Sequence, residues 1–353
     1  MRTLFDTIEL ENIIDLCKKR PTVLVATPNY EERSVGFLQW FLKECDPSTI
    51  DPTRIIIHLL WPKGTSARVD LLEQLKALHF EKITEPLKQY TVDRTVFSYP
   101  NDFNDREIID HVLRTLEYFP GEPYNLLIDI SCMPRLVLVS VCHAIRQFFL
   151  SKETRQQISV YFVYASPGRY AALRYAQNVG GIKGYFSGRP IHDCRSDHLS
   201  AIVFPSLQGY EGKLLYDEVR TRISSSVTAF VAVNCNDYLT SLATMRANQF
   251  LLEQRDVNIS YYFSIKDGLD KLAYLLENEA SRAAERIAHS KLILVAPFGP
   301  KVFTIAACFM LWNLKDNFEG IDTEIAHVSG FQYLSLYSLG LGNMSGYKLT
   351  CED

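Results

Sequence analysis

The sequence predicts an α/β fold made of two tandem Rossmann-like domains with mostly parallel sheets, related by an internal duplication. Short apolar, β-branched runs alternate with helical patterns along the 353 residues, which is typical of parallel sheets covered by helices on both faces. Hydrophobic residues make up 47% and charged residues 22% of the chain, a composition that excludes a mainly disordered or fibrous protein. The expected elements of the second half also follow the order of those in the first.

The first half is expected to begin with a lead-in helix within residues 1–20 and to continue as a Rossmann-like domain over residues 21–180. Helical apolar spacing follows each of its first four strands, with Asn104 as the N-cap of one helix and Pro134 as the first residue of another. The fifth strand is expected to break at Ser166-Pro-Gly. The expected strands are 22–27, 54–60, 95–98, 124–130 and 158–165.

Residues 181–227 are expected to connect the two domains, because glycines cluster at their start and a polar run follows. A strand and a helix are expected inside this connection, at 201–204 and 212–221. A second, smaller Rossmann-like domain is expected over residues 228–353. Its expected strands are 228–233, 259–264, 291–295 and 322–328, with helices at 270–289 and from 300 to 314.

The duplication rests on a short match between the two halves. When residues 126–142 are laid on residues 292–308, Pro134 falls on Pro300 and Arg135 on Lys301. Strands that begin Thr-x-x-Val-Ala occur at Thr22 and at Thr228. Two unrelated α/β domains are the alternative, since all folds of this class share the same alternation.

Candidate ligand-binding residues follow the expected strands, because parallel α/β sheets bind ligands beyond the carboxyl ends of their strands. Three strand ends in the first half carry polar side chains that we assign to a ligand site. They are Thr27, Asn29 and Arg33 after the first strand, Asp129, Ser131 and Arg135 after the fourth, and Ser166 and Arg169 after the fifth.

The loop from Asp129 to Arg135 suggests an anionic ligand. The unpaired N–H groups and the dipole of the helix that follows attract anions, while Ser131 adds a hydroxyl and Arg135 a bidentate cation. Phosphate or a phosphodiester is therefore the expected ligand, and Lys301 holds the matching place in the second half. In the alternative interpretation, Ser131 caps the helix and Arg135 pairs with Asp129 or Glu31.

No cofactor and no metal are expected. The glycine-rich nucleotide fingerprint, the Walker A sequence and the nucleophile elbow are absent from the sequence. His192-x-Cys194-x-x-x-His198 lacks a second ligand pair of zinc spacing, which favours a plain polar loop. The adjacent Glu31 and Glu32 are expected at a solvated helix start.

The composition also limits partners and compartment. The net charge of −4 argues against an extended nucleic-acid surface, although a small basic pocket remains compatible with it. The eight cysteines include no C-x-x-C pair, which favours a reducing, cytoplasmic location. The apolar stretches 126–150 and 292–314 contain charges or prolines, so no membrane span is expected. Acidic residues interrupt residues 1–20 before any apolar run of sufficient length, so no secretion signal is expected.

The strand–Asp-Ile-Ser-x-x-x-Arg–helix unit at residues 129–135 resembles the ligand loop of CRISPR-associated Rossmann-fold (CARF) sensor domains. In that family a strand commonly ends in Ser/Thr-Gly-Gly-Thr-Lys/Arg and then enters a helix. This chain has Cys132-Met133-Pro134 in place of Gly-Gly-Thr. The resemblance is confined to the first half of the chain.

The CARF resemblance implies a ligand, a quaternary state and a context. It places Ser131 and Arg135 on one wall of the site and Thr27 and Asn29 on the other. The implied ligand is a cyclic oligonucleotide messenger, the implied assembly is a homodimer, and the implied setting is prokaryotic antiviral defence. Because the sequence shows no nuclease signature, a separate effector protein would act on the signal.

Three functions follow as hypotheses. The first is a sensor that binds a nucleotide or a small phosphorylated ligand and acts through an effector partner. The second is an enzyme acting on a nucleotide or nucleic-acid phosphate, with Glu31, Glu32 and Asp129 as acid and base groups. The third is a structural subunit of a complex whose ligand sites are relics of the duplication.

Overall fold

A computed structural model describes most of the chain. The described residues are 2–64, 69–99, 104–119, 121–150, 158–170, 181–194, 198–207, 209–221, 225–233, 238–285, 291–328 and 338–352. They form two compact units, each built around its own sheet. Unit 1 comprises Met1–Arg174 with Tyr333–Asp353, and unit 2 comprises Tyr175–Gln332.

Unit 1 contains a seven-stranded sheet in the order β1-β13-β6-β5-β2-β3-β4. The five strands from β6 to β4 are mutually parallel, whereas β13 is antiparallel to both β6 and β1. The strands are β1 Arg2–Ile8, β2 Thr22–Ala26, β3 Ile55–Gly64, β4 Thr91–Tyr99, β5 Tyr124–Asp129, β6 Ile158–Tyr170 and β13 Ser338–Glu352. The helices are α1 Leu10–Lys19, α2 Arg33–Glu44, α3 Val69–Leu87, α4 Asp105–Thr115 and α5 Arg135–Leu150, with a short 3-10 turn η1 at Pro52–Arg54.

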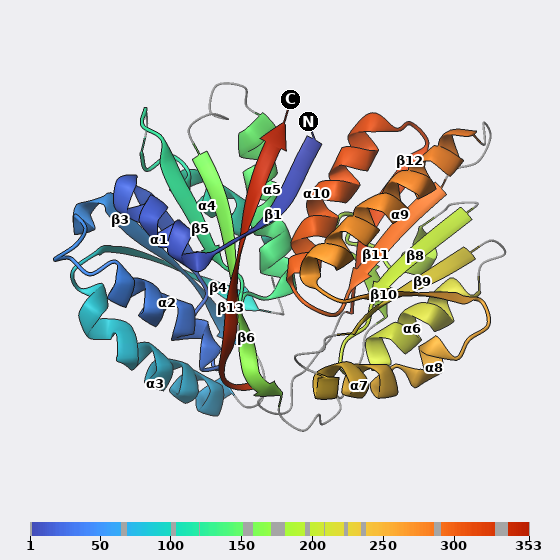
Figure 1. The fold of residues 1–353 in the computed structure, drawn as a ribbon, viewed down its shortest axis with the longest axis horizontal. Helices are drawn as coiled ribbons and strands as arrows, with labels where there is room; N and C mark the ends of the chain where they lie inside the picture. The colour runs from blue at the N-terminus through green and yellow to red at the C-terminus, as the bar shows by residue number, and fades with distance from the viewer. Residues whose placement is uncertain are drawn as a thin grey trace. The chain divides into compact units, whose positions relative to one another are not determined.

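Helices cover both faces of this sheet (Figure 1). Alternate side chains of the strands join α1, α2 and α3 in one core, which includes Phe37, Phe41 and Ile57. Because side chains alternate across a strand, the neighbouring positions face α4 and α5, as the contact between His58 of β3 and His111 of α4 shows. The predicted three-layer arrangement of the first domain is therefore confirmed.

Unit 2 contains a six-stranded sheet in the order β10-β9-β8-β11-β12-β7. Its strands from β10 to β12 are parallel, and β7 is antiparallel to β12. The strands are β7 Ile182–Gly184, β8 His198–Phe204, β9 Ser225–Ala232, β10 Val257–Tyr262, β11 Lys291–Pro297 and β12 Ile321–Val328. The helices are α6 Tyr210–Val219, α7 Tyr238–Ala247, α8 Gln249–Leu252, α9 Ile265–Glu285 and α10 Val302–Asn317, with a 3-10 turn η2 at Ile191–Asp193.

The parallel strands of the two units follow one another in the same order. Numbered along the chain within each unit, both sheets read 3-2-1-4-5, which is the Rossmann order. The match of β5-α5 with β11-α10 agrees with this order, as a duplication predicts. The match of Thr22 with Thr228 is wrong, because Thr228 lies in β9, the second strand of unit 2, whereas β8 is the first.

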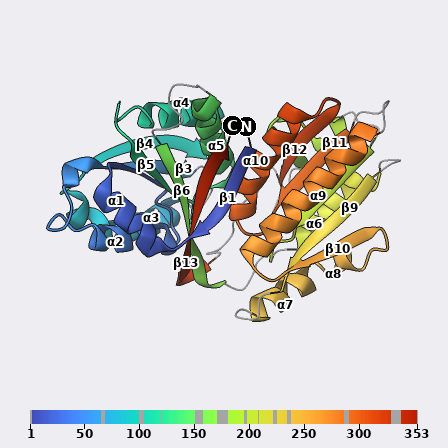
Figure 2. The ribbon, with the colours of Figure 1, turned by 45° about the horizontal axis from the view of Figure 1, so that its top comes forward.

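The expected domain limits require correction. Residues 181–227, expected as a connection, supply β7, β8, α6 and the start of β9 to the second sheet. The C-terminal strand β13 belongs to unit 1, where Figure 2 shows it between β1 and β6. Each unit therefore has an antiparallel strand that follows the fifth parallel strand of the other unit along the chain. Strand β7 of unit 2 follows β6 of unit 1, and β13 of unit 1 follows β12 of unit 2. Such pairing joins residues far apart in sequence, so local patterns could not indicate it.

The N-terminal segment also differs from the expectation. Residues 2–8 form β1 in register with β13, from Arg2 opposite Glu352 to Ile8 opposite Gly346. The helix α1 then begins at Leu10. Strand β1 lacks a period-2 alternation of polar and apolar residues, and its partner lies at the other end of the chain, so the local sequence did not indicate a strand.

Candidate functional site in unit 1

The predicted site residues of the first half flank the point where strand order reverses. Strands β2 and β5 are neighbours, and the chain leaves β2 toward β3 on one side and β5 toward β6 on the other. Thr27 lies two residues beyond Val25, which is paired with Ile128. The loop after β2 and the loop after β5 therefore meet at the position where Rossmann folds bind ligands.

The loops after β2 and β5 are joined to β6 by one chain of hydrogen bonds. The Ser131 hydroxyl donates to Asp129 Oδ1, which also accepts the Ser131 backbone N–H at 2.9 Å. The same hydroxyl oxygen accepts the Ala165 N–H at 2.8 Å. Arg33 donates to the Ala165 carbonyl at 3.2 Å and to Glu31 Oε2 at 2.9 Å.

The members of this hydrogen-bonded network are buried, so their polar groups position the loops. Ser131 is 0% and Arg33 is 4% exposed. Burial lowers the pKa of Arg33, but the neighbouring Cys132 and Glu31 raise it by more, so the net pKa is raised and the guanidinium stays charged. Ser131 therefore fixes the end of β5 against β6.

Thr27 differs from the network residues because its hydroxyl is buried without a partner. Thr27 is 2% exposed, and its Oγ1 atom has no hydrogen-bond partner among the described residues. A buried hydroxyl without a partner is costly, and in folded proteins such an atom is commonly satisfied by a bound water, ion or ligand. Thr27 therefore places an unsatisfied buried hydroxyl at the end of β2, next to the loop after β5.

Helix α5 begins beside the end of β2, which Thr27 follows. The helix starts at Arg135, and its first backbone bond runs from Leu138 N to the Pro134 carbonyl. The N–H groups of its first turn consequently have no acceptor within the helix and present a positive dipole end. Arg135 is partly exposed there. Cys132 and Met133 are buried, so the larger residues of this turn are packed within the protein.

Asn29 has a local structural role. Its Oδ1 atom accepts the Tyr30 N–H at 2.8 Å, and its carbonyl accepts the Ser34 hydroxyl at 2.9 Å. These bonds shape the turn from β2 into α2. Asn29 is partly exposed, so the turn still borders the crevice.

The expected loop at Ser166 and Arg169 is wrong, because β6 continues through both residues to Tyr170. Leu341 pairs with Pro167 and Leu339 with Arg169 in the ladder with β13. The Ser166 hydroxyl donates to the Asn343 carbonyl at 2.9 Å, which ties it to β13. Pro167 can lie in this strand because prolines are tolerated at irregular positions, and the register of the ladder shifts between Leu341 and Met344. The side chain of Arg169 lies outside the described residues.

Lys301 belongs to unit 2 and precedes α10, in the same relation to β11 that Arg135 has to β5. The switch point of unit 2 is filled. Phe204 and Phe303 stack at 4.0 Å and are both fully buried, and Gly299 N donates to the Phe204 carbonyl at 2.8 Å.

The acidic residues near the crevice of unit 1 are engaged. Glu31 pairs with Arg33, and Glu32 pairs with Lys82 at 3.3 Å. Glu31 is buried, so the expected solvated helix start is wrong for Glu31, whereas Glu32 is exposed as expected. The sequence indicated these charges but not their pairing, because side chains two residues apart do not face each other on a helix.

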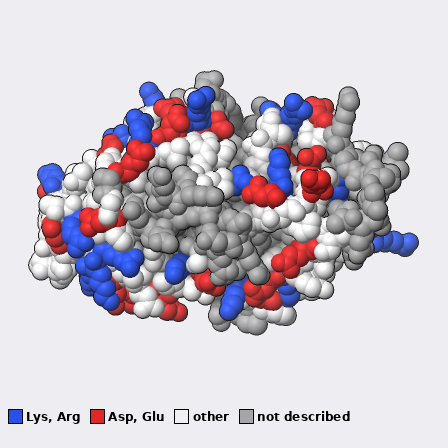
Figure 3. Space-filling model, turned by 90° about the horizontal axis from the view of Figure 1, so that it is seen from above, with Lys and Arg blue, Asp and Glu red and all other residues white. Residues whose placement is uncertain are grey.

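Three further observations limit what the described residues can bind. No group of three or more His, Cys, Asp or Glu side chains among them is arranged to hold a metal ion. In the same residues, no helix combines the length and the apolar character that crossing a bilayer requires. On the face shown in Figure 3, the described Lys and Arg side chains lie interspersed with Asp and Glu.

Comparisons with known proteins add no name to this geometry. No protein-family model matches the chain, and no curated protein matches its sequence.

Proposed function

We propose that unit 1 is a sensor domain that binds a nucleotide or another small phosphorylated ligand at the switch point between β2 and β5. The observation that carries the proposal is the buried, unpartnered hydroxyl of Thr27 beside the N-terminus of α5. A phosphate group accepts hydrogen bonds from a hydroxyl and from helix N-terminal N–H groups, and Arg135 adds a charge-assisted contact. The CARF resemblance supports the same ligand class and, within that class, implies a cyclic oligonucleotide.

In this proposal the residues of the crevice divide into two roles. Thr27, Arg135 and the first turn of α5 contact the ligand. Arg33, Ser131 and Asp129 hold the loops, because their polar atoms already bind one another. A separate effector protein would read the bound state, and unit 2, whose own switch point is filled by aromatic rings, is the candidate surface for that contact.

The enzymatic alternative has less support. Acid–base catalysis needs a carboxylate that reaches the reacting group. Glu31 and Glu32 are ion-paired, and Asp129 accepts two hydrogen bonds from Ser131. These partners favour binding over turnover.

The structural-subunit alternative rests on a different observation in unit 2. Several large apolar side chains are exposed there, on α7, α8, β10 and the helix and turn that follow β10. They are Tyr238, Leu239, Leu242, Phe250, Ile259, Tyr261, Phe263 and Tyr274. Exposed apolar groups in such number are typical of protein–protein contact, which a sensor with an effector partner also requires.

Calorimetric titration tests the proposal. The chain is titrated with inorganic phosphate, a nucleoside monophosphate, a linear dinucleotide and cyclic di- and oligonucleotides. We expect one of these to bind, and Arg135→Ala to weaken that binding about 10- to 100-fold, the effect of removing one charge-assisted hydrogen bond. Lys301→Ala, at the matching place in unit 2, is the control and should bind unchanged. Absence of binding, or equal binding by Arg135→Ala, would reject the proposal.

A further inference from the structure

A second surface of unit 1 lies away from the switch point, on β4 at the edge of the sheet. Among the described residues, β4 is the terminal strand of the sheet and pairs with β3 alone. Val92 and Val96 are 40% and 49% exposed, and Arg94 between them is exposed too. Because side chains alternate, these three residues share one face of β4. Helix α3 packs on β3 at this face, where Phe80 contacts Trp61, while the three side chains of β4 remain exposed.

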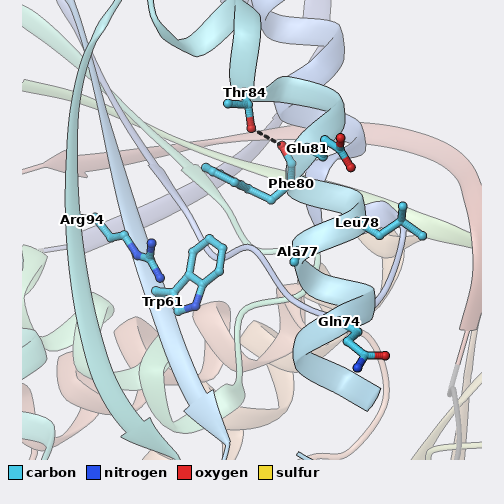
Figure 4. Close-up of a pocket in the computed structure, with 8 residues that line it drawn as sticks. All are labelled: Trp61, Gln74, Ala77, Leu78, Phe80, Glu81, Thr84 and Arg94. Carbon is cyan, nitrogen blue, oxygen red and sulfur yellow. Dashed lines mark hydrogen bonds between the residues drawn. The ribbon is translucent and has the colours of Figure 1, made fainter. Parts of the chain in front are cut away.

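A hollow of about 640 Å³ lies between β4, β3 and α3 on this face. Figure 4 shows Trp61 and Arg94 on the strands and the other lining side chains along the helix. Trp61 packs edge-on against Phe80 of α3, with ring centroids 5.1 Å apart. The lining residues are Trp61, Gln74, Ala77, Leu78, Phe80, Glu81, Thr84 and Arg94.

The two cations near Trp61 differ in what they bind. The Lys76 ammonium lies 4.7 Å from the indole centroid and also binds the Pro62 carbonyl and Glu73, each at 2.7 Å. The Arg94 guanidinium lies 3.8 Å from the same centroid. With the described residues it makes neither an ion pair nor a side-chain hydrogen bond, so its N–H donors are held in place by stacking and remain available.

A charge on an edge strand commonly prevents unwanted strand pairing. Two features of β4 go beyond that protective role. The guanidinium is stacked on a nearly buried indole, which restricts its motion, and an exposed valine lies on each side of it. The face therefore alternates apolar, cationic and apolar groups beside a hollow that is itself partly apolar.

We propose that the edge of β4 binds an extended acidic peptide segment by strand addition. The added strand would carry apolar, acidic and apolar side chains at alternate positions, opposite Val92, Arg94 and Val96. Opposite charges and apolar groups are the favourable cross-strand pairs, and Arg binds a carboxylate in bidentate geometry. The backbone groups at the open edge supply the affinity common to strand addition, and the side-chain faces supply selectivity.

A second copy of this chain fits the same edge less well. An antiparallel pair of β4 strands centred on this surface would place Arg94 opposite Arg94 of the other copy. Like charges directly opposite one another destabilise a sheet. The acidic residue of the peptide is thus the element that selects the partner.

Fluorescence anisotropy of labelled peptides tests the proposal on the full chain. The probes are a peptide Thr-Val-Thr-Glu-Thr-Val-Thr, its counterpart with Lys in place of Glu, and a Glu peptide with N-methylated backbone amides. We expect the Glu peptide to bind at least about tenfold more tightly than the Lys peptide, the size of one favourable charge pair against one unfavourable pair. N-methylation should abolish binding, because it removes the backbone donors.

A charge-reversal variant makes the test specific. In Arg94→Glu the preference should invert, so that the Lys peptide binds more tightly. Arg106→Glu, an exposed cation of α4, changes the net charge equally and should leave the preference unchanged. The proposal is overturned if neither peptide binds, if the N-methylated peptide binds as well as its parent, or if Arg94→Glu keeps the original preference.

Discussion

The hydroxyl oxygen of Ser131 accepts a hydrogen bond at 2.8 Å from the backbone N–H of Ala165, which lies 34 residues further along the chain. This contact fastens the loop after β5 to the neighbouring strand β6. The loop that a ligand would meet is therefore held by the sheet and does not depend on the ligand for its position. In a sensor, such preorganisation lowers the cost of ordering the site on binding.

Removing the Ser131 hydroxyl should destabilise unit 1. Ser131→Ala leaves the Ala165 N–H without its acceptor and Asp129 with one donor fewer, and an unsatisfied buried group costs about 1–3 kcal/mol. We expect the urea midpoint of unit 1 to fall accordingly. Ser140→Ala is the matched control, because its hydroxyl binds only the Leu136 carbonyl of its own helix and should change the free energy of unfolding by less than about 0.5 kcal/mol. Equal midpoints for Ser131→Ala and the unchanged protein would contradict the structural role of Ser131.

Breaking the buried pair of Arg33 and Glu31 from one side should be more severe than removing both charges. Arg33→Met removes the cation that pairs with the buried Glu31 carboxylate, a loss that costs about 3–5 kcal/mol. In the double variant Arg33→Met, Glu31→Gln, we expect part of that loss to be recovered. Chemical denaturation of both variants measures the difference. A double variant less stable than Arg33→Met would show that the carboxylate has another partner of comparable strength.

Acid should destabilise unit 1 through a buried histidine pair. His58 and His111 are in hydrogen-bond contact through their Nε2 atoms. Burial and then the neighbouring His111 lower the pKa of His58 to about 4, while burial lowers the pKa of His111. Asp93 of β4 opposes this shift for both rings, whereas Arg114 of α4 reinforces it.

The direction of the pH effect follows from these shifts. In the unfolded chain histidine has a pKa of about 6.5, so between about pH 6.5 and pH 4 the unfolded chain binds protons that the folded chain does not. The free energy of unfolding should therefore fall as the pH falls through this range, by about 3 kcal/mol for His58, and be insensitive to histidine above it. Unfolding titrations at several pH values should give a shallower slope for His58→Gln, His111→Gln. An unchanged slope would contradict the assignment.

The C-terminal strand should be necessary for the stability of unit 1. Deleting residues 338–353 removes β13, the partner of both β1 and β6. We expect faster amide hydrogen exchange along β6, with β11 of unit 2 unchanged, because β11 pairs with β8 and β12 alone. Exchange along β6 at the original rate would show that β13 does not contribute to this sheet in solution.

The fold was predictable where its signals are local. The apolar runs that became β2, β5 and β11 are strands because buried parallel strands are apolar throughout, and Pro134 marks the start of α5 to within one residue. The strands β1 and β13 were missed, since each is defined by a partner from the other end of the chain. The extension of β6 through Pro167 has the same cause.

The sequence indicated where the candidate site residues lie, but not which of them hold the loops and which have a hydroxyl without a partner. Residue type and position identified Thr27, Ser131 and Arg33 at the strand ends. Their hydrogen bonds separate a buried supporting network from an unpartnered hydroxyl, and that distinction depends on three-dimensional contacts. Arg94 had a signal in the sequence, the alternation Val-x-Arg-x-Val on a strand, which is readable once β4 is known to be an edge.

Thr27→Val gives the most direct test of ligand binding at the switch point. The substitution removes a hydroxyl that has no described partner, so the free energy of unfolding should stay equal or rise. Thr304→Val in unit 2 removes a hydroxyl that is likewise buried without a described partner, and it is the matched control. Calorimetric titration with the phosphate and nucleotide series should show binding weakened by Thr27→Val and unchanged by Thr304→Val. Binding of equal strength in both variants, or no binding to the unchanged protein, would contradict the account.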